Sequence, residues 1–70
     1  MSAYRVKFFK YLLSSDGHEF RCLQQQIDVP NIESSDQAAE SAARQFEKLR
    51  GVRDWKVLAD SIEVESANHN

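Results

Sequence analysis

Two long runs of β-forming residues flank the dipeptide Asp16-Gly17, and this arrangement limits the fold more than any other feature of the chain. Residues 4–13 mix aromatic and β-branched side chains with basic ones, and residues 18–29 form the second run. Asp-Gly accepts the positive φ angles that a two-residue type I′ turn requires. The sequence therefore predicts a β-hairpin that turns at Asp16-Gly17. We expect its pairing to end at Pro30, which has no N–H for a ladder.

A helix is expected next, beginning at Ser34 or Ser35 and ending before Gly51. Ser34 and Gln37 have the spacing of a capping box, and Gly51 is suited to a left-handed C-terminal cap. Apolar residues recur at helical spacing and form one stripe: Ala38, Ala39, Ala42, Ala43, Phe46 and Leu49. We expect Phe46 and Leu49 to be its deep anchors against a sheet, and Glu40 to pair with Arg44 on the solvent side.

A third strand is expected over residues 52–65, which completes the order β-β-α-β. This strand could pair in parallel with the second strand or cross over to pair with the first. We favour the second arrangement, because a right-handed crossover helix then covers the sheet and the long first strand becomes central. The predicted fold class is therefore α+β, with a three-stranded antiparallel sheet of order 2-1-3 and one helix packed on one face. The chain has 70 residues, enough for one small domain. We assign residues 1–65 to it and residues 66–70 to a disordered tail.

The apolar pattern of the strands changes side halfway along the hairpin. A two-residue turn pairs Tyr4 with Val29 and Val6 with Ile27, so these side chains share one face. Nearer the turn it pairs Leu13 with Phe20, and the apolar residues there have the opposite parity. The third strand changes parity at about the same level. The apolar residues of the turn end are Phe9, Tyr11, Leu13, Phe20, Cys22, Trp55 and Val57.

Two interpretations of this change are open. In the first, the ladder is continuous and these residues form an apolar patch on the sheet face away from the helix, which would be an interface with a protein partner or a second copy. In the second, β-bulges carry both apolar sets onto one core face, and nothing unusual is exposed.

Charge is distributed unevenly along the expected fold. Acidic residues gather at the open end of the hairpin: Asp28, Glu33, Asp36, Asp60, Glu63 and Glu65. Basic residues gather at the turn end together with the helix C-terminus: Lys10, Arg21, Lys48, Arg50, Arg53 and Lys56. Such an end favours phosphate groups, so a weak binder of single-stranded RNA is the alternative hypothesis. A net charge of −2 disfavours it.

No arrangement of residues predicts catalysis, a metal or a cofactor. His18, Glu19 and Cys22 are too few for a zinc site, because the other histidine, His69, lies in the expected tail. Three carboxylates, Asp54, Asp60 and Glu63, occur without a nucleophile or base at a recognisable spacing. We expect a non-enzymatic protein with no metal and no cofactor.

The expected location is the cytoplasm. A single cysteine excludes an internal disulfide framework and is typical of a reducing compartment. No apolar run approaches the roughly 20 residues of a membrane span.

Three segments, YRVKF…DGHEFRC, SSDQAAESAARQFEK and DWKVLADSIEVE, resemble a group of short uncharacterised bacterial proteins. The resemblance covers residues 4–65 and implies no activity and no site residues. The order β-β-α-β is also similar to that of a small large-subunit ribosomal protein of archaea and eukaryotes, in topology alone.

Overall fold

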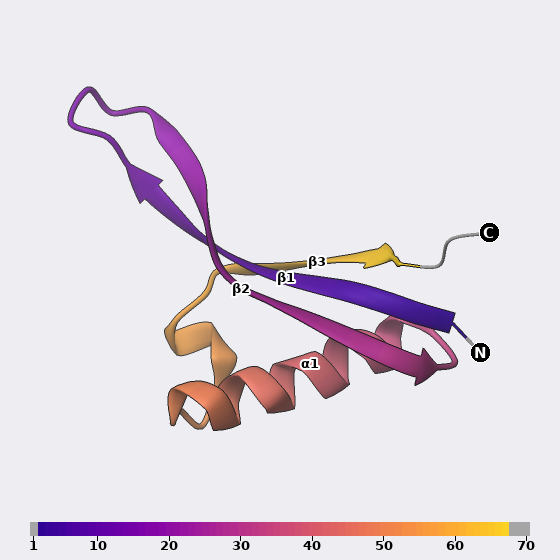
Figure 1. Cartoon of the computed structure of the whole chain (residues 1–70). Helices are drawn as coiled ribbons and strands as arrows, with labels where there is room; N and C mark the ends of the chain where they lie inside the picture. The colour runs from indigo at the N-terminus through magenta and orange to yellow at the C-terminus, as the bar shows by residue number, and fades with distance from the viewer. Residues whose placement is uncertain (1, 68–70) are drawn as a thin grey trace.

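The computed structural model describes residues 2–67 (Figure 1). β1 (Ser2–Leu13) lies between β2 (Glu19–Ile32) and β3 (Ser61–Ser66) in an antiparallel sheet of order β2-β1-β3. α1 (Ser35–Arg50) packs against one face of this sheet. The predicted fold class, element order and strand order are therefore confirmed.

The core lies between α1 and the sheet. Val6 and Phe8 of β1 and Phe46 of α1 are fully buried there. The rings of Phe8 and Phe46 stack with centroids 4.3 Å apart, which is possible because the buried Ala38 and Ala42 allow the helix to approach the sheet closely. The other core residues are Ile27, Val29 and Ala59.

α1 begins and ends at the expected residues. Ser34 is the N-cap, and its hydroxyl accepts a hydrogen bond from the Gln37 N–H at 3.2 Å. Gly51 adopts a left-handed conformation with φ 69°, and its N–H donates to the Glu47 carbonyl. Glu40 pairs with Arg44 as predicted. The expectation for Leu49 is wrong, because its side chain is 66% exposed at the end of the helix.

The third strand is shorter than predicted. It begins at Ser61 instead of residue 52, because residues 55–57 form a short 3-10 helix, η1 (Trp55–Val57). The Asp54 carboxylate caps η1 by accepting the Lys56 N–H at 3.0 Å, and this local bond competes with strand pairing. Ser66 belongs to β3, and the Ala67 N–H donates to the Ala3 carbonyl at 2.9 Å. The rest of the predicted tail, residues 68–70, lies outside the described residues.

The hairpin turn differs from the predicted type I′ turn. The Gly17 N–H donates to the Ser14 carbonyl at 3.0 Å, and the Ser14 N–H donates to the His18 carbonyl at 2.8 Å. Only Gly17, at φ 87°, has a positive φ in this loop. These features define a three-residue loop in which a type I turn is followed by a left-handed glycine. The loop shifts the pairing next to the turn by one residue, so that Leu12 faces Phe20 and Leu13 faces Glu19.

A β-bulge in β2 cancels this shift before the strands reach the core. Phe9 faces Leu23 and Phe8 faces Gln25, which leaves Gln24 as the extra residue of β2. Below the bulge, the pairs Tyr4–Val29, Arg5–Asp28 and Val6–Ile27 have the predicted register. The turn and the core therefore require registers that differ by one residue, and Gln24 absorbs the difference.

Pairing also continues past Pro30, contrary to expectation. Ser2 faces Ile32, and a second irregularity separates this pair from the pair Tyr4–Val29. Asn31 has a positive φ of 55° within it. Because β2 is an edge strand, a proline can be accommodated where its nitrogen points away from β1.

Candidate interaction surface on the hairpin arm

The hairpin extends beyond the rest of the fold. Pairing of β1 with β3 stops at Phe9, whereas pairing of β1 with β2 continues to Leu13. Residues 10–23, here called the arm, therefore form a two-stranded ribbon that projects from the body of the molecule (Figure 1). The projecting arm is the feature by which this molecule differs most from a compact small domain.

Asp60 marks the boundary between the body and the arm. Its N–H donates to the Phe9 carbonyl at 2.7 Å, and its carboxylate accepts the Tyr11 N–H at 2.7 Å. The Asp60 side chain thus satisfies the β1 edge where a further strand residue would otherwise pair. A charged side chain at this point also disfavours extension of the ladder.

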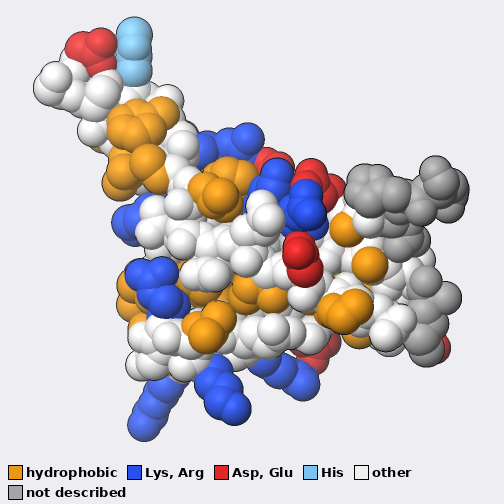
Figure 2. Space-filling model, viewed as in Figure 1, with side chains coloured by type: hydrophobic (Ala, Val, Ile, Leu, Met, Phe, Trp, Pro, Cys, Tyr) orange, Lys and Arg blue, Asp and Glu red, His pale blue; other side chains and the backbone are white. Residues whose placement is uncertain are grey.

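The arm exposes apolar side chains on both of its faces. Cross-strand partners share a face, so Tyr11, Leu13 and Leu23 lie on the face turned away from α1, here called the outer face. Leu13 is 72% and Leu23 is 52% exposed. Leu12 and Phe20 lie on the other face, here called the helix-side face, and both are exposed. Figure 2 shows hydrophobic side chains at the surface of the projecting arm.

The structure divides the predicted interface residues among three places. Phe9, Tyr11 and Leu13 belong to the outer face, whereas Phe20 and Cys22 belong to the helix-side face. The prediction that one face holds all of them is wrong, because the loop at Gly17 shifts the register near the turn. Sequence analysis missed Leu12 and Leu23, which an assumed three-residue loop would have paired with Phe20 and Phe9.

Trp55 and Val57 lie on η1 and not on a strand. The Trp55 ring is half-buried and packs against the Phe8 ring in a T-shaped arrangement, with centroids 5.9 Å apart. The backbone N–H of Trp55 donates to the Glu47 carboxylate at 2.9 Å. Trp55 therefore joins α1 to the core. Val57, at the other end of η1, is 66% exposed.

The outer face of the body is charged, in contrast to the arm. Arg5 pairs with Asp28 at 3.2 Å, and Lys7 pairs with Glu65 at 3.3 Å. These residues alternate with the core residues of β1, as expected for a sheet with one solvated face.

Phe9 and Arg21 lie where this charged face meets the arm. The Arg21 guanidinium lies 4.4 Å from the centroid of the Phe9 ring and pairs with Glu63. Phe9 is therefore covered by a side chain of its own chain, and it is not a free platform for stacking.

The basic residues of the nucleic-acid hypothesis are also divided. Arg21 is held on the outer face by Glu63, whereas Lys10 pairs across the strands with Cys22 on the helix-side face. Arg50, Arg53 and Lys56 lie at the C-terminal end of α1 and around η1. The guanidinium of Arg50 is 5.7 Å from the centroid of the Phe46 ring.

The residues considered for chemistry have structural partners. Asp54 caps η1, Asp60 caps the β1 edge, and Glu63 binds Arg21. Glu19 and Cys22 lie on opposite faces of the arm. Within residues 2–67 there is no group of three metal-ligating side chains, and His69 lies outside this range.

The Asp16 carboxylate belongs to the turn. It accepts hydrogen bonds from the Ser14 hydroxyl and, at 3.3 Å, from the His18 N–H. The Ser14 bond first, and then the His18 bond, hold the pKa of Asp16 below its usual value. The tip of the arm therefore carries an ionised carboxylate at neutral pH.

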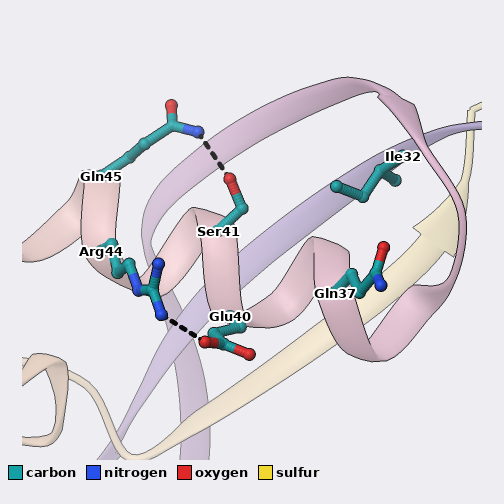
Figure 3. Close-up of a pocket in the computed structure, with 6 residues that line it drawn as sticks. All are labelled: Ile32, Gln37, Glu40, Ser41, Arg44 and Gln45. Carbon is teal, nitrogen blue, oxygen red and sulfur yellow. Dashed lines mark hydrogen bonds and ion pairs between the residues drawn. The ribbon is translucent and has the colours of Figure 1, made fainter.

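An open hollow of about 380 Å³ lies between α1 and Ile32 (Figure 3). Four of its polar side chains are engaged with each other: Arg44 pairs with Glu40, and the Gln45 amide donates to the Ser41 hydroxyl at 3.3 Å. It therefore presents no unpaired charge to a ligand.

None of the helices in the described part of the chain is both long and apolar enough to cross a membrane. No protein-family model, curated protein or solved structure matches the chain.

Proposed function

We propose that this protein is a non-enzymatic interaction module of the cytoplasm, and that the outer face of its arm binds a second copy of the chain. The proposal includes membership of the bacterial group that residues 4–65 resemble. The observation that carries it is the exposure of Tyr11, Leu13 and Leu23 on a ribbon that no other element of the described chain covers.

Exposed apolar side chains on a two-stranded ribbon have a cost. A lone hairpin is marginally stable in water, and burial of its exposed apolar surface against a partner is favourable. Scattered surface leucines need no explanation, but Leu13 and Leu23 share one face with Tyr11. The arm therefore has the properties of a contact surface.

A second copy suits this face because its charges are self-complementary. On the outer face Leu13 faces Glu19, and Tyr11 faces Arg21. Two arms stacked antiparallel about a two-fold axis bring the Glu19 of one copy toward the Arg21 of the other, which also binds Glu63 of its own chain, while the apolar residues meet between them. Association also offers a small domain extra stability.

The experiment is a measurement of solution mass. Sedimentation equilibrium up to a concentration on the order of 1 mM is expected to show dimers of the native chain, and Leu13→Lys or Leu23→Lys to give monomers. Both side chains are largely exposed, so the variants are expected to keep their fold and their circular dichroism spectrum.

Leu49→Lys is the matched control, because Leu49 is similarly exposed but lies on α1. It is expected to leave the dimer intact. A native chain that stays monomeric throughout the range, or equal dissociation by the control, would contradict the proposal.

A further inference from the structure

The lysines and arginines fall into two groups by their surroundings. Arg5, Lys7, Arg21 and Arg44 each pair with a carboxylate. Within residues 2–67 no such pair involves the remaining ones: Lys10, Lys48, Arg50, Arg53 and Lys56. The second group lies where α1 ends and the arm begins, so the positive charge at this end is not neutralised by ion pairs.

Exposed apolar side chains accompany these unpaired cations. Leu49 continues the buried stripe of Ala42 and Phe46 past the point where the sheet covers it. Leu49 and Val57 are each 66% exposed. Figure 2 shows lysine and arginine side chains around the α1 end of the molecule, with hydrophobic side chains between them.

η1 and the base of the arm are neighbours. The Trp55 ring packs against the Phe8 ring in a T-shaped arrangement, and Lys10 is the next residue of β1 on the same face as Phe8. The helix-side face of the arm therefore begins next to the part of β1 against which η1 packs. We call this combined region the basic–apolar surface, and its main residues are Lys10, Leu49, Arg50, Arg53, Lys56 and Val57.

We propose that the basic–apolar surface binds an acidic, leucine-bearing segment of another protein. Carboxylates of such a segment complement the unpaired cations, and its leucines cover Leu49 and Val57. This surface is distinct from the outer face of the arm, and the inference goes beyond self-association.

A nucleic acid fits this surface less well. Base recognition by single-strand binders depends on exposed aromatic rings close to the cations. Trp55, the aromatic residue of η1, is half-buried against Phe8, and Phe9 is covered by Arg21. The exposed rings of Tyr11 and Phe20 lie on the arm, away from Arg50, Arg53 and Lys56 in the sequence. Exposed leucine and valine add nothing to phosphate binding, and the net charge of the chain is −2.

An anionic membrane also fits less well. Leu13 and Phe20 flank a tip that contains Asp16 and Glu19, and the hydrogen bonds from Ser14 and His18 favour the ionised form of Asp16. Insertion of the arm would move these carboxylates toward the hydrocarbon region, which is costly.

The test uses a labelled synthetic amphipathic peptide of glutamate and leucine, with binding followed by fluorescence anisotropy at low ionic strength. The double variant Arg53→Glu/Lys56→Glu is expected to raise the dissociation constant by about tenfold or more. Arg44→Glu is the control, since Arg44 is already paired with Glu40, and is expected to change it by less than about twofold.

Other probes decide between the classes of partner. A glutamate–serine peptide of equal charge is expected to bind more weakly, because its side chains do not cover Leu49 and Val57. Leu13→Lys is expected to leave peptide binding unchanged, which separates this inference from self-association. Absence of peptide binding, or tighter binding of a uridine oligonucleotide or of anionic vesicles than of the peptide, would overturn the proposal.

Discussion

The body and the arm are built from the same two strands, yet their side chains have opposite surroundings. In the body, Val6 and Phe8 are fully buried by α1, and the opposite face carries ion pairs such as Arg5–Asp28. In the arm, Leu13 is 72% exposed, and the strand pairing of β1 with β3 has already ended at Phe9. Strand pairing continues through both regions, so the ladder alone does not determine which residues form the core. The position of the helix does.

The largest expected change in stability comes from a substitution in the core of the body, which leaves the residues of the arm unchanged. Phe46 is fully buried and stacks on Phe8. Phe46→Ala is expected to lower the free energy of unfolding by about 3–5 kcal/mol, a large share of the roughly 5–15 kcal/mol typical of a domain. Leu13→Ala in the arm is expected to change it by no more than about 0.5 kcal/mol. Urea denaturation followed by circular dichroism measures both.

Both denaturation experiments are done at protein concentrations low enough for the chain to be monomeric. A loss at Leu13 comparable to the loss at Phe46 would show that the arm packs against the body in solution.

A smaller change in stability is expected from a substitution at Asp60, which lies at the boundary between the body and the arm. Asp60→Ala removes the acceptor of the Tyr11 N–H and is expected to cost about 1 kcal/mol. Asp60→Asn retains an acceptor oxygen and is expected to cost less. Hydrogen exchange of the Tyr11 amide is expected to accelerate in the alanine variant, while exchange at Val6 follows the global stability. Unchanged exchange at Tyr11 would mean that Asp60 does not hold the edge.

The smallest effect is confined to the tip of the arm. Because the pKa of Asp16 is lowered in the folded chain, its contribution to stability is present above the unfolded value of 3.8 and is lost as pH falls through the folded value. Ser14→Ala removes the main cause and is expected to raise the pKa of Asp16. An NMR titration of the carboxyl carbon measures this change, and acidification is expected to shift amide signals near the turn before those of Val6. A pKa that is the same in both chains would contradict the assigned role of Ser14.

The sequence by itself determined the features that depend on local chemistry. Ser34 and Gly51 specify the ends of α1, because a hydroxyl cap and a left-handed glycine act within one turn of the helix. The alternation of apolar and polar residues at the open end of the hairpin identified Val6 and Ile27 as core residues. The preferred right-handed crossover indicated that β3 lies beside β1.

Only the tertiary structure decided how these local preferences were reconciled. Asp16-Gly17 is compatible with a two-residue or a three-residue loop, and the bonds from Ser14 and His18 favour the longer one. That loop and the core require different registers, so β2 carries a bulge at Gln24. Leu49 has the spacing of a core residue, but the sheet does not reach it. The candidate surfaces follow from these long-range fits, because exposure depends on where the helix and β3 end, and neither limit is visible in residues 10–23 themselves.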